Sequence, residues 1–283
     1  MDKKIVFFDL DGTLVMHTQN GSFIPNSAIK ALTKAKENGH LLFISTGRSL
    51  AMIDDELLNN PLFDGVIAAS GACILYKGEI IFHRPYDKDD LNNLRNLLES
   101  NNIFHWLESN EGIFFNVDMF KEQYLERKKR SLPRFFDKLK PIDEECLNKI
   151  NKVSYVDTFN PFSFEEKLLA NKYILVPMSY DGQGENRGEI SPLNISKGTA
   201  IKYVLNKLNI EKKWAYCFGD SNNDLSMFPY VGVSICMGNG KEEVKKKATY
   251  TTKNIDDGGI EHGLRYFGLI WKRQKNLSKN INT

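Results

Sequence analysis

Cysteines and histidines are few in this sequence, and neither type is spaced as a metal-binding motif. The four cysteines form no CxxC pair, and two of them, Cys217 and Cys236, lie in apolar, strand-like runs. This spacing excludes a cysteine-based metal motif and favours buried free thiols, as in a reducing, cytoplasmic compartment. The histidines show no ligand spacing and are expected to be structural or surface residues: His17, His40, His83, His105 and His262.

Long apolar runs and a large net charge are also absent. No stretch approaches the ~20 apolar residues of a membrane span. The apolar run near the N-terminus is interrupted by Asp9 and Asp11, too early for a signal peptide. The net charge of +2 argues against a nucleic-acid-binding protein that depends on a basic field. We therefore expect neither a membrane nor a nucleic acid as a partner.

The sequence is rich, by contrast, in short apolar strands that alternate with helices. This order predicts an α/β fold, with a Rossmann-like parallel-sheet core and helices on its faces. The predicted strands of this core are residues 5–8, 41–45, 66–69, 214–218 and 231–237. The predicted helices are residues 25–38, a helix that ends near residue 59, residues 197–208, a helix through residue 227 that Pro229 stops, and residues 241–248 and 258–267.

A different pattern separates the two halves of this core. The chain of 283 residues suits about two domains, and the strand–helix rhythm is lost between residues 84 and 189. We predict an inserted α+β cap domain there, and a discontinuous core of residues 1–83 and 190–283. The predicted cap helices are residues 91–100, 119–130 and 164–170, and its strands are residues 104–107, 112–117, 153–156 and 173–178.

Polar motifs follow three of the predicted core strands directly. Ligands of open α/β sheets collect at the carboxyl ends of strands, so these motifs can converge on one site. A fourth candidate, Lys197, begins a helix. The motif residues that follow strands are Asp9, Asp11, Thr46, Gly47, Arg48, Asp220, Asn223 and Asp224.

The residue types in these motifs suit the hydrolysis of a phosphate ester. Asp9 can attack phosphorus and form an aspartyl-phosphate, while Asp11 can protonate the leaving group and then activate water. Mg²⁺ prefers oxygen ligands, which Asp9, the backbone carbonyl of Asp11 and Asp220 can supply. The phosphate can be bound by Thr46, the N–H groups around Gly47 and Lys197, with Asn223 and Asp224 completing the pocket.

Each motif taken singly also has a structural explanation. The DxD run can be a strand followed by an acidic turn, and Thr46-Gly47 can be a plain strand-to-helix turn. Lys197 can be an exposed lysine, and Arg48 can anchor its helix. The GDSNND run can cap a helix or form a calcium loop without its distal Glu. The conjunction of the motifs, each after its own element, favours the catalytic interpretation.

These motifs resemble, in order, the four motifs of the haloacid dehalogenase-like superfamily, most closely its Cof-type sugar-phosphatase branch. The matching runs are FFDLDGT, STGR, SKG and GDSNND, and the predicted cap lies between the second and the third. The resemblance implies that Asp9 is the nucleophile and Asp11 the general acid/base. It also implies Mg²⁺ ligands (Asp9, Asp11, Asp220), phosphate ligands (Thr46, Lys197, Asn223) and a supporting role for Asp224 behind the metal.

One position departs from the pattern of that branch. Relatives often have Ser-Asn-Gly after the third strand, whereas this chain has Ala69-Ser70-Gly71. Whether Ser70 assists the site as Asn would is left open.

We therefore predict a Mg²⁺-dependent phosphatase for small phosphomonoesters, such as sugar phosphates or phosphorylated cofactors, acting as a monomer or weak homodimer. A phosphomutase of the same superfamily and a non-catalytic phosphate sensor are the alternatives. The cap is expected to select the substrate. Its candidate contacts are Lys128, Lys129, Arg130, Trp106, Phe114 and Phe115, which can equally be a solvated helix end and core aromatics.

Overall fold

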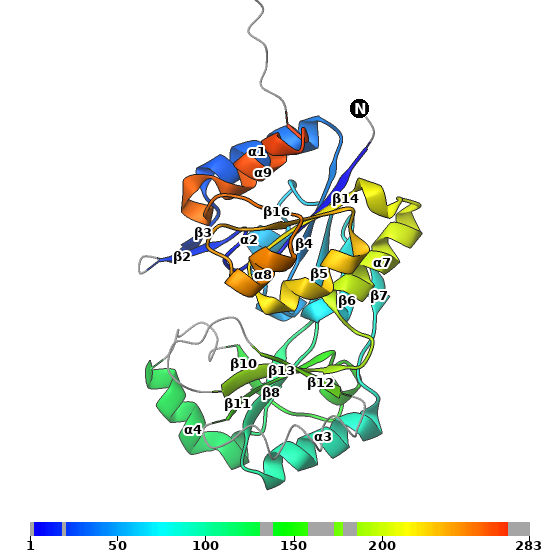
Figure 1. Cartoon of the computed structure of the whole chain (residues 1–283). Helices are drawn as coiled ribbons and strands as arrows, with labels where there is room; N and C mark the ends of the chain where they lie inside the picture. Colours follow the sequence, from blue (N-terminus) through cyan, green and yellow to red (C-terminus); the bar gives the residue numbers. More distant parts are fainter. Residues whose placement is uncertain (1–2, 19–20, 131–137, 158–172, 178–185, 271–283) are drawn as a thin grey trace, which may run out of the picture.

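A computed structural model describes residues 3–18, 21–130, 138–157, 173–177 and 186–270. Their strands form an eight-stranded sheet, a six-stranded sheet and a two-stranded hairpin. Figure 1 shows the two larger sheets in two bodies, one above the other. Within these described residues, no helix has the length and apolar character needed to cross a membrane. All four cysteines are buried and free, as predicted for Cys217 and Cys236.

The eight-stranded sheet confirms the predicted α/β class. Its strand order is β16-β15-β14-β1-β4-β5-β6-β7, and every pair from β16 to β5 is parallel, whereas β6 and β7 are antiparallel additions. The strands are β1 (Ile5–Phe8), β4 (Leu41–Ser45), β5 (Gly65–Ala68), β6 (Cys73–Tyr76), β7 (Glu79–His83), β14 (Ala215–Gly219), β15 (Val233–Cys236) and β16 (Tyr250–Thr251).

Strand β1 lies in the interior of the eight-stranded sheet, between β14 and β4, and all four of its side chains are buried. Val6 and Phe8 join a core with helices α1 (Asn26–Glu37) and α9 (Gly259–Tyr266), and Ile5 and Phe7 join a core with α7 (Lys197–Leu208). Figure 1 shows α1 and α9 together on one side of the sheet and α7 on the other. Each fully buried side chain of this kind stabilises the fold by about 1.5–3 kcal/mol.

The six-stranded sheet is built from the middle of the chain. Its order is β10-β9-β8-β11-β13-β12, and Figure 1 shows its helices on the side away from the eight-stranded sheet. Strand β13 runs to Pro192, so the chain leaves this sheet after the boundary that we predict at residue 189. The elements are α3 (Lys88–Ser100), β8 (Phe104–Glu108), β9 (Ile113–Phe115), α4 (Val117–Arg130), β10 (Leu139–Pro141), β11 (Lys152–Asp157), β12 (Tyr173–Pro177) and β13 (Asn186–Pro192).

Several predicted elements differ from the observed ones. The helix predicted after Arg48 is only a 3-10 turn, Leu50–Met52, and the four-residue α2 (Asp55–Leu58). The helix predicted to end at residue 227 consists of two 3-10 turns, Asn222–Ser226 and Phe228–Tyr230, and Pro229 lies inside the second turn rather than after a helix. The predicted helix at residues 164–170 lies outside the described residues.

The remaining elements are short. The segment after the DxD run forms a hairpin of β2 (Met16–Thr18) and β3 (Gly21–Phe23). Helix α8 (Glu242–Lys247) is two residues shorter than predicted, and the two-residue β16 was not predicted.

Candidate active site

The strand order brings the predicted motifs to one edge of the sheet. Strand β1 lies between β14 and β4. The strands β4 and β5 follow on one side of β1, and β14, β15 and β16 follow on the other, so the strand order reverses at β1. Asp9, Thr46 and Asp220 follow the carboxyl ends of β1, β4 and β14 directly. Crevices at such a reversal of strand order are the usual ligand sites of open α/β sheets.

A buried lysine connects two of the predicted carboxylates. Lys197 Nζ lies 2.5 Å from Asp9 Oδ1 and 2.7 Å from Asp224 Oδ1. Only 1% of Lys197 is exposed, so its ammonium depends on these anionic partners. Burial lowers the pKa of Lys197, but Asp224 and Asp9 outweigh it and raise the pKa above its ordinary value. Lys197 is therefore a charged part of the site and not an exposed first-turn lysine.

The start of α7 fixes the position of this lysine. Ser196 is the N-cap, and its hydroxyl accepts a hydrogen bond from the N–H of Thr199, while the Thr199 hydroxyl accepts from the N–H of Ser196. This capping box sets the first helical residue at Lys197.

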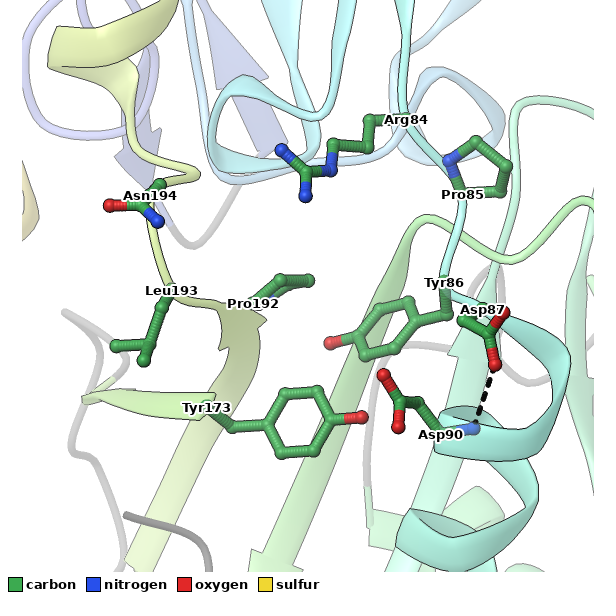
Figure 2. A pocket seen from close by; sticks show the side chains of 9 residues that line it. All are labelled: Arg84, Pro85, Tyr86, Asp87, Asp90, Tyr173, Pro192, Leu193 and Asn194. Atoms are coloured by element: carbon green, nitrogen blue, oxygen red, sulfur yellow. Dashed lines mark hydrogen bonds between the residues drawn. The ribbon is translucent and has the colours of Figure 1, made fainter. Parts of the chain in front are cut away.

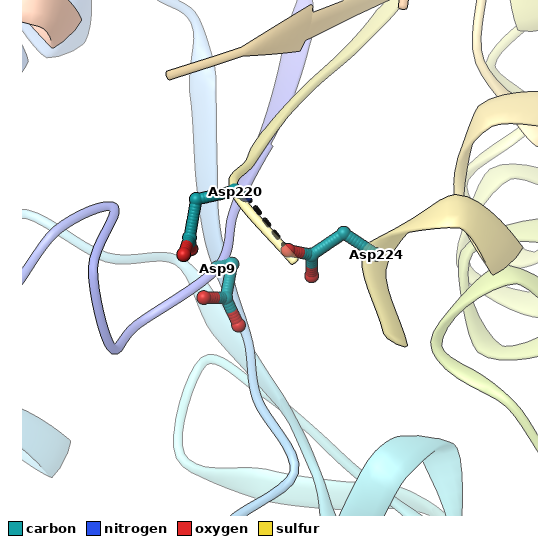
Figure 3. Close-up of side chains that lie close together, drawn as sticks. All are labelled: Asp9, Asp220 and Asp224. Carbon is teal, nitrogen blue, oxygen red and sulfur yellow. Dashed lines mark hydrogen bonds between the residues drawn. The ribbon is translucent and has the colours of Figure 1, made fainter. Parts of the chain in front are cut away.

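Three carboxylates gather at this point (Figure 3). Oxygens of Asp9, Asp220 and Asp224 lie within 4.8 Å of one another. Burial and the neighbouring Asp224 raise the pKa of Asp9 well above its usual range, and the same two causes raise the pKa of Asp220 to about 6. One lysine leaves this cluster with an excess of negative charge. Carboxylate oxygens are the donors that Mg²⁺ takes, so the residues fit a hard divalent cation.

Asp224 differs from the other two in how its oxygens are used. Its Oδ1 binds Lys197, and its Oδ2 accepts hydrogen bonds from the N–H groups of Asp220 and Ser221. Asp220 Oδ1 accepts a hydrogen bond from the Thr13 hydroxyl at 3.0 Å. Asp224 therefore holds the loop after β14 and the lysine together.

The Asp11 side chain points to other partners. Arg48 donates to it from Nε at 3.0 Å and from Nη2 at 2.5 Å, and His17 Nε2 lies 2.7 Å away. Burial opposes ionisation of Asp11, but the hydrogen bond with His17 and the charge of Arg48 outweigh it and lower its pKa to about 2. His17 is exposed, as a surface residue is expected to be, but its role beside Asp11 was missed. Its place on β2, six residues after Asp11, is a signal that could have indicated it.

Thr46 and Gly47 form the turn after β4. The N–H of Thr46 donates to Ile67 O, and its hydroxyl oxygen accepts from the N–H of Arg48 at 3.1 Å. A side chain at Gly47 would meet Glu189 of β13, because a Cβ there would lie 2.8 Å from Glu189 Oε1. The six-stranded body therefore reaches directly to this turn.

Comparison with known proteins decides the family. The family model of haloacid dehalogenase-like hydrolases matches residues 6–264. The chain belongs to this family. The predicted resemblance and the predicted enzyme class, a phosphatase of this family, are thereby confirmed.

The chain is similar to several known proteins over nearly its whole length. Phosphatase YwpJ of Bacillus subtilis is 28% identical, with 93% of this chain and 99% of the relative covered. The 5-amino-6-(5-phospho-D-ribitylamino)uracil phosphatase YwtE of the same organism is 29% identical, with 92% and 96% covered. The solved structure of BT4131, a sugar phosphatase of HAD subclass IIB, matches with a TM-score of 0.76 and 25% identity, with 95% and 100% covered.

A cavity of about 240 Å³ adjoins the buried lysine of this hydrolase. It is lined on the core side by Lys197, Asn223 and Ser70, and on the other side by Ile174 and Val176 of β12. Asn223 Oδ1 accepts a hydrogen bond from the Ser221 hydroxyl at 2.7 Å. The cavity therefore combines polar groups of the eight-stranded body with an apolar strand of the other.

A second cavity, of about 280 Å³, lies where the chain passes between the two bodies (Figure 2). Arg84, Tyr86 and Tyr173 are among its lining residues, and the Tyr86 hydroxyl donates to Ile190 O. None of the predicted site residues lines it.

The predicted cap contacts divide into two groups. Trp106, Phe114 and Phe115 are buried in apolar clusters, as the core interpretation of these aromatics predicts. The side chains of Lys128, Lys129 and Arg130 lie outside the described residues.

Proposed function

We propose that this hydrolase is a Mg²⁺-dependent phosphomonoesterase that works through an aspartyl-phosphate on Asp9. The observation that carries the proposal is the position of Asp9, which is 5% exposed at the end of β1 and paired with the buried Lys197. A carboxylate in this position can attack phosphorus while the lysine neutralises charge on the phosphoryl oxygens.

The other predicted residues have matching tasks in this proposal. Asp11 takes the general acid/base role, for which it must first take up a proton, because Arg48 and His17 hold it as a carboxylate in the structure described. The protonated group then donates to the leaving oxygen and later takes a proton from water. Thr46, the N–H groups around Gly47, Lys197 and Asn223 bind the phosphate. Mg²⁺ would be held by Asp9, Asp220 and the backbone carbonyl of Asp11, where it would offset the negative charge of the site. Both oxygens of Asp224 already accept hydrogen bonds, so Asp224 supports the metal site without binding the ion directly.

The substrate in this proposal is a small phosphate ester whose leaving group enters the cavity of about 240 Å³ beside Lys197. The activities named for YwtE and BT4131 support a sugar phosphate or a phosphorylated cofactor precursor as the substrate class. The residues 84–189 serve as the cap over this cavity. The protein acts in the cytoplasm as a monomer or weak homodimer, without a nucleic-acid partner.

Phosphate release tests this proposal. The purified protein is given an aryl phosphate and a panel of sugar phosphates, with Mg²⁺ or with EDTA, beside the Asp9→Asn variant. We expect Mg²⁺-dependent release that the variant loses, because an amide is a poor nucleophile. Release by the variant near the wild-type rate would contradict the role of Asp9. Transfer of phosphate to a second hydroxyl of a sugar, without free phosphate, would favour a phosphomutase.

A further inference from the structure

A cluster of buried polar side chains lies on the face of the six-stranded sheet that is turned toward the core. Side chains alternate between the two faces of a strand, so Glu108 of β8, Lys152 and Ser154 of β11, and Glu189 of β13 share this face. The register pairs Lys152 with Glu108 and Ser154 with Glu189. Each of the four residues is less than 9% exposed. Charged residues so buried are expensive unless they are paired.

Lys152 is the centre of this cluster. Its Nζ lies 2.7 Å from Glu189 Oε1 and 3.5 Å from Glu108 Oε1. The Trp106 indole N–H and the Ser154 hydroxyl also donate to Glu108 Oε1, at 2.9 and 2.8 Å. The bonds from Trp106 and Ser154 fix Glu108, and the two carboxylates together hold the lysine.

The cluster contacts the core at two points. Lys152 Nζ donates to the carbonyl oxygen of Gly47 at 2.7 Å, and the Ser70 hydroxyl donates to Glu189 Oε2 at 2.7 Å. Ser70, the residue that departs from the family pattern, is therefore a contact with the other body.

The first contact continues through the backbone to Thr46. Gly47 O belongs to the peptide group whose N–H, that of Arg48, donates to the Thr46 hydroxyl oxygen at 3.1 Å. A cation on the carbonyl polarises this peptide group and strengthens the N–H as a donor. The hydroxyl oxygen accepts there, so its proton is directed to another acceptor. Thr46 is only 1% exposed, so bulk water does not compete for this proton.

The second contact holds the neighbouring turn. Ala69 and Ser70 have φ values of 48° and 53°, in the left-handed region, which is strained for residues other than glycine. Their N–H groups donate to Arg48 O and Thr46 O, at 2.7 and 3.1 Å. The turn after β4 is thus held from one side by a strained turn and from the other by Lys152.

We propose that Lys152 is a positioning residue, which orients the Thr46 hydroxyl toward phosphate through the Gly47–Arg48 peptide when the two bodies are in contact. The identity of the anion rests on the proposed function. Contact of the two bodies then completes the phosphate site, and Glu189 with Ser70 keeps that contact in register.

A double-mutant cycle on phosphate binding tests this proposal. Isothermal titration calorimetry measures the affinity for inorganic phosphate, in the presence of Mg²⁺, of the wild type, Lys152→Met, Thr46→Val and the double variant. We expect each single variant to bind about tenfold more weakly. The double variant should bind no more than about twofold more weakly than Thr46→Val, because both changes break the same chain.

The matched control is Lys138→Met. Lys138 also donates to a carbonyl of the core, that of Ala51 at 3.2 Å, but it is exposed and the turn after β4 is not its partner. We expect this variant to bind phosphate as the wild type does. Lys152→Met leaves two buried carboxylates without the lysine and can therefore fail to fold. In that case the variant that combines Lys152→Met with Glu189→Gln, which has one buried charge fewer, takes the place of Lys152→Met in the cycle.

The outcomes separate this proposal from the proposed function. The role of Lys152 would be overturned if Lys152→Met binds phosphate as the wild type does. It would also be overturned if the fold-losses in phosphate affinity of the two single variants multiply in the double variant. Either result stands even if phosphate esters are hydrolysed. The predicted coupling without hydrolysis of any ester would overturn the phosphatase proposal alone. A wild-type protein that binds no phosphate would overturn both.

Discussion

At the scale of single residues, the site depends on the balance between one buried cation and three carboxylates. Lys197 contacts Asp9 and Asp224, whereas Asp220 has no cation within ion-pair distance among the described residues. This imbalance explains why the pKa of Asp220 is raised to about 6, through burial and the charge of Asp224. A bound cation would supply a positive partner for this carboxylate.

Removal of the Asp220 carboxylate should weaken the activation of the enzyme by Mg²⁺ and change the fold little. In Asp220→Ala we expect the Mg²⁺ concentration for half-maximal activity to rise about tenfold or more, because a charged oxygen ligand is lost. Titration of phosphatase activity with Mg²⁺ measures this. The exposed Asp256 provides the control, since Asp256→Ala should leave the curve unchanged. An unaltered Mg²⁺ requirement in Asp220→Ala would show that the metal assignment is wrong.

The raised pKa of Asp220 also predicts a pH dependence of stability in EDTA. The folded pKa of about 6 lies above the ordinary value of 3.8, so the folded state binds a proton more tightly than the unfolded state. The resulting loss of stability therefore builds up between about pH 4 and pH 6 and is complete above pH 6, so lowering the pH from 7.5 to 5 relieves about half of it. We expect Asp220→Asn to melt roughly 2–6 °C above the wild type at pH 7.5, and to lose about half of that advantage at pH 5.

Thermal unfolding followed by circular dichroism at the two pH values measures this difference. An advantage of the variant that is the same at both pH values would contradict the assignment of the titration to Asp220.

At the scale of secondary-structure elements, the start of helix α7 positions the buried Lys197. Ser196 caps this helix, and Lys197 is its first residue. In Ser196→Ala we expect a loss of about 0.5–2 kcal/mol in the free energy of unfolding, which is a fall of about 1–8 °C in Tm for a chain of this size. Activity should also fall several-fold, because fraying of the first turn displaces Lys197.

Helix α3 supplies the matched control for this prediction. Asp87 caps α3 by accepting hydrogen bonds from the N–H groups of Asp89 and Asp90. Asp87→Ala should therefore cost a similar free energy of unfolding without the fall in phosphate release per folded molecule. Equal activity losses in Ser196→Ala and Asp87→Ala would contradict a specific role for the α7 cap.

The strands of the core could be predicted from the sequence more reliably than its short helices. Strands β1 and β4 are continuous apolar runs between polar residues, and their observed bounds equal the predicted ones. Helix α7 also has its predicted bounds, because its serine cap is explicit in the sequence. The segments after Arg48 and Ser221 form 3-10 turns, since local hydrogen bonds to Thr46 and Asp224 replace regular helical ones. Composition alone does not distinguish these turns from helices.

At the scale of the whole molecule, the sequence could indicate which residues meet within the core, but not what the other body brings to them. The motifs after β1, β4 and β14 lie at adjacent strand ends, as the parallel order predicts. Lys152 and Glu189 lie far from every motif in the sequence and reach the turn after β4 only through the register of the second sheet. No local pattern around either residue marks it as part of the site.

The direction of the Asp11 side chain is another feature that only the folded chain shows. Its partner Arg48 is 37 residues away in the sequence, and the bidentate contact of the two keeps Asp11 ionised in the structure described. As the general acid of the proposed mechanism, Asp11 would need a proton when an alkoxide leaves. With an acidic phenol as the leaving group that proton is not needed. The formation of the aspartyl-phosphate can then be separated from its hydrolysis.

This separation gives the most direct test of a covalent intermediate on Asp9. The Asp11→Asn variant is mixed rapidly with an aryl phosphate that has an acidic phenol, and phenol and free phosphate are followed together, with acid quenching and mass spectrometry. We predict a burst of phenol about equal to the enzyme, without matching phosphate, and a phosphoryl group on the peptide that contains Asp9. Simultaneous release of phenol and phosphate from the first turnover, with no adduct on that peptide, would contradict the account.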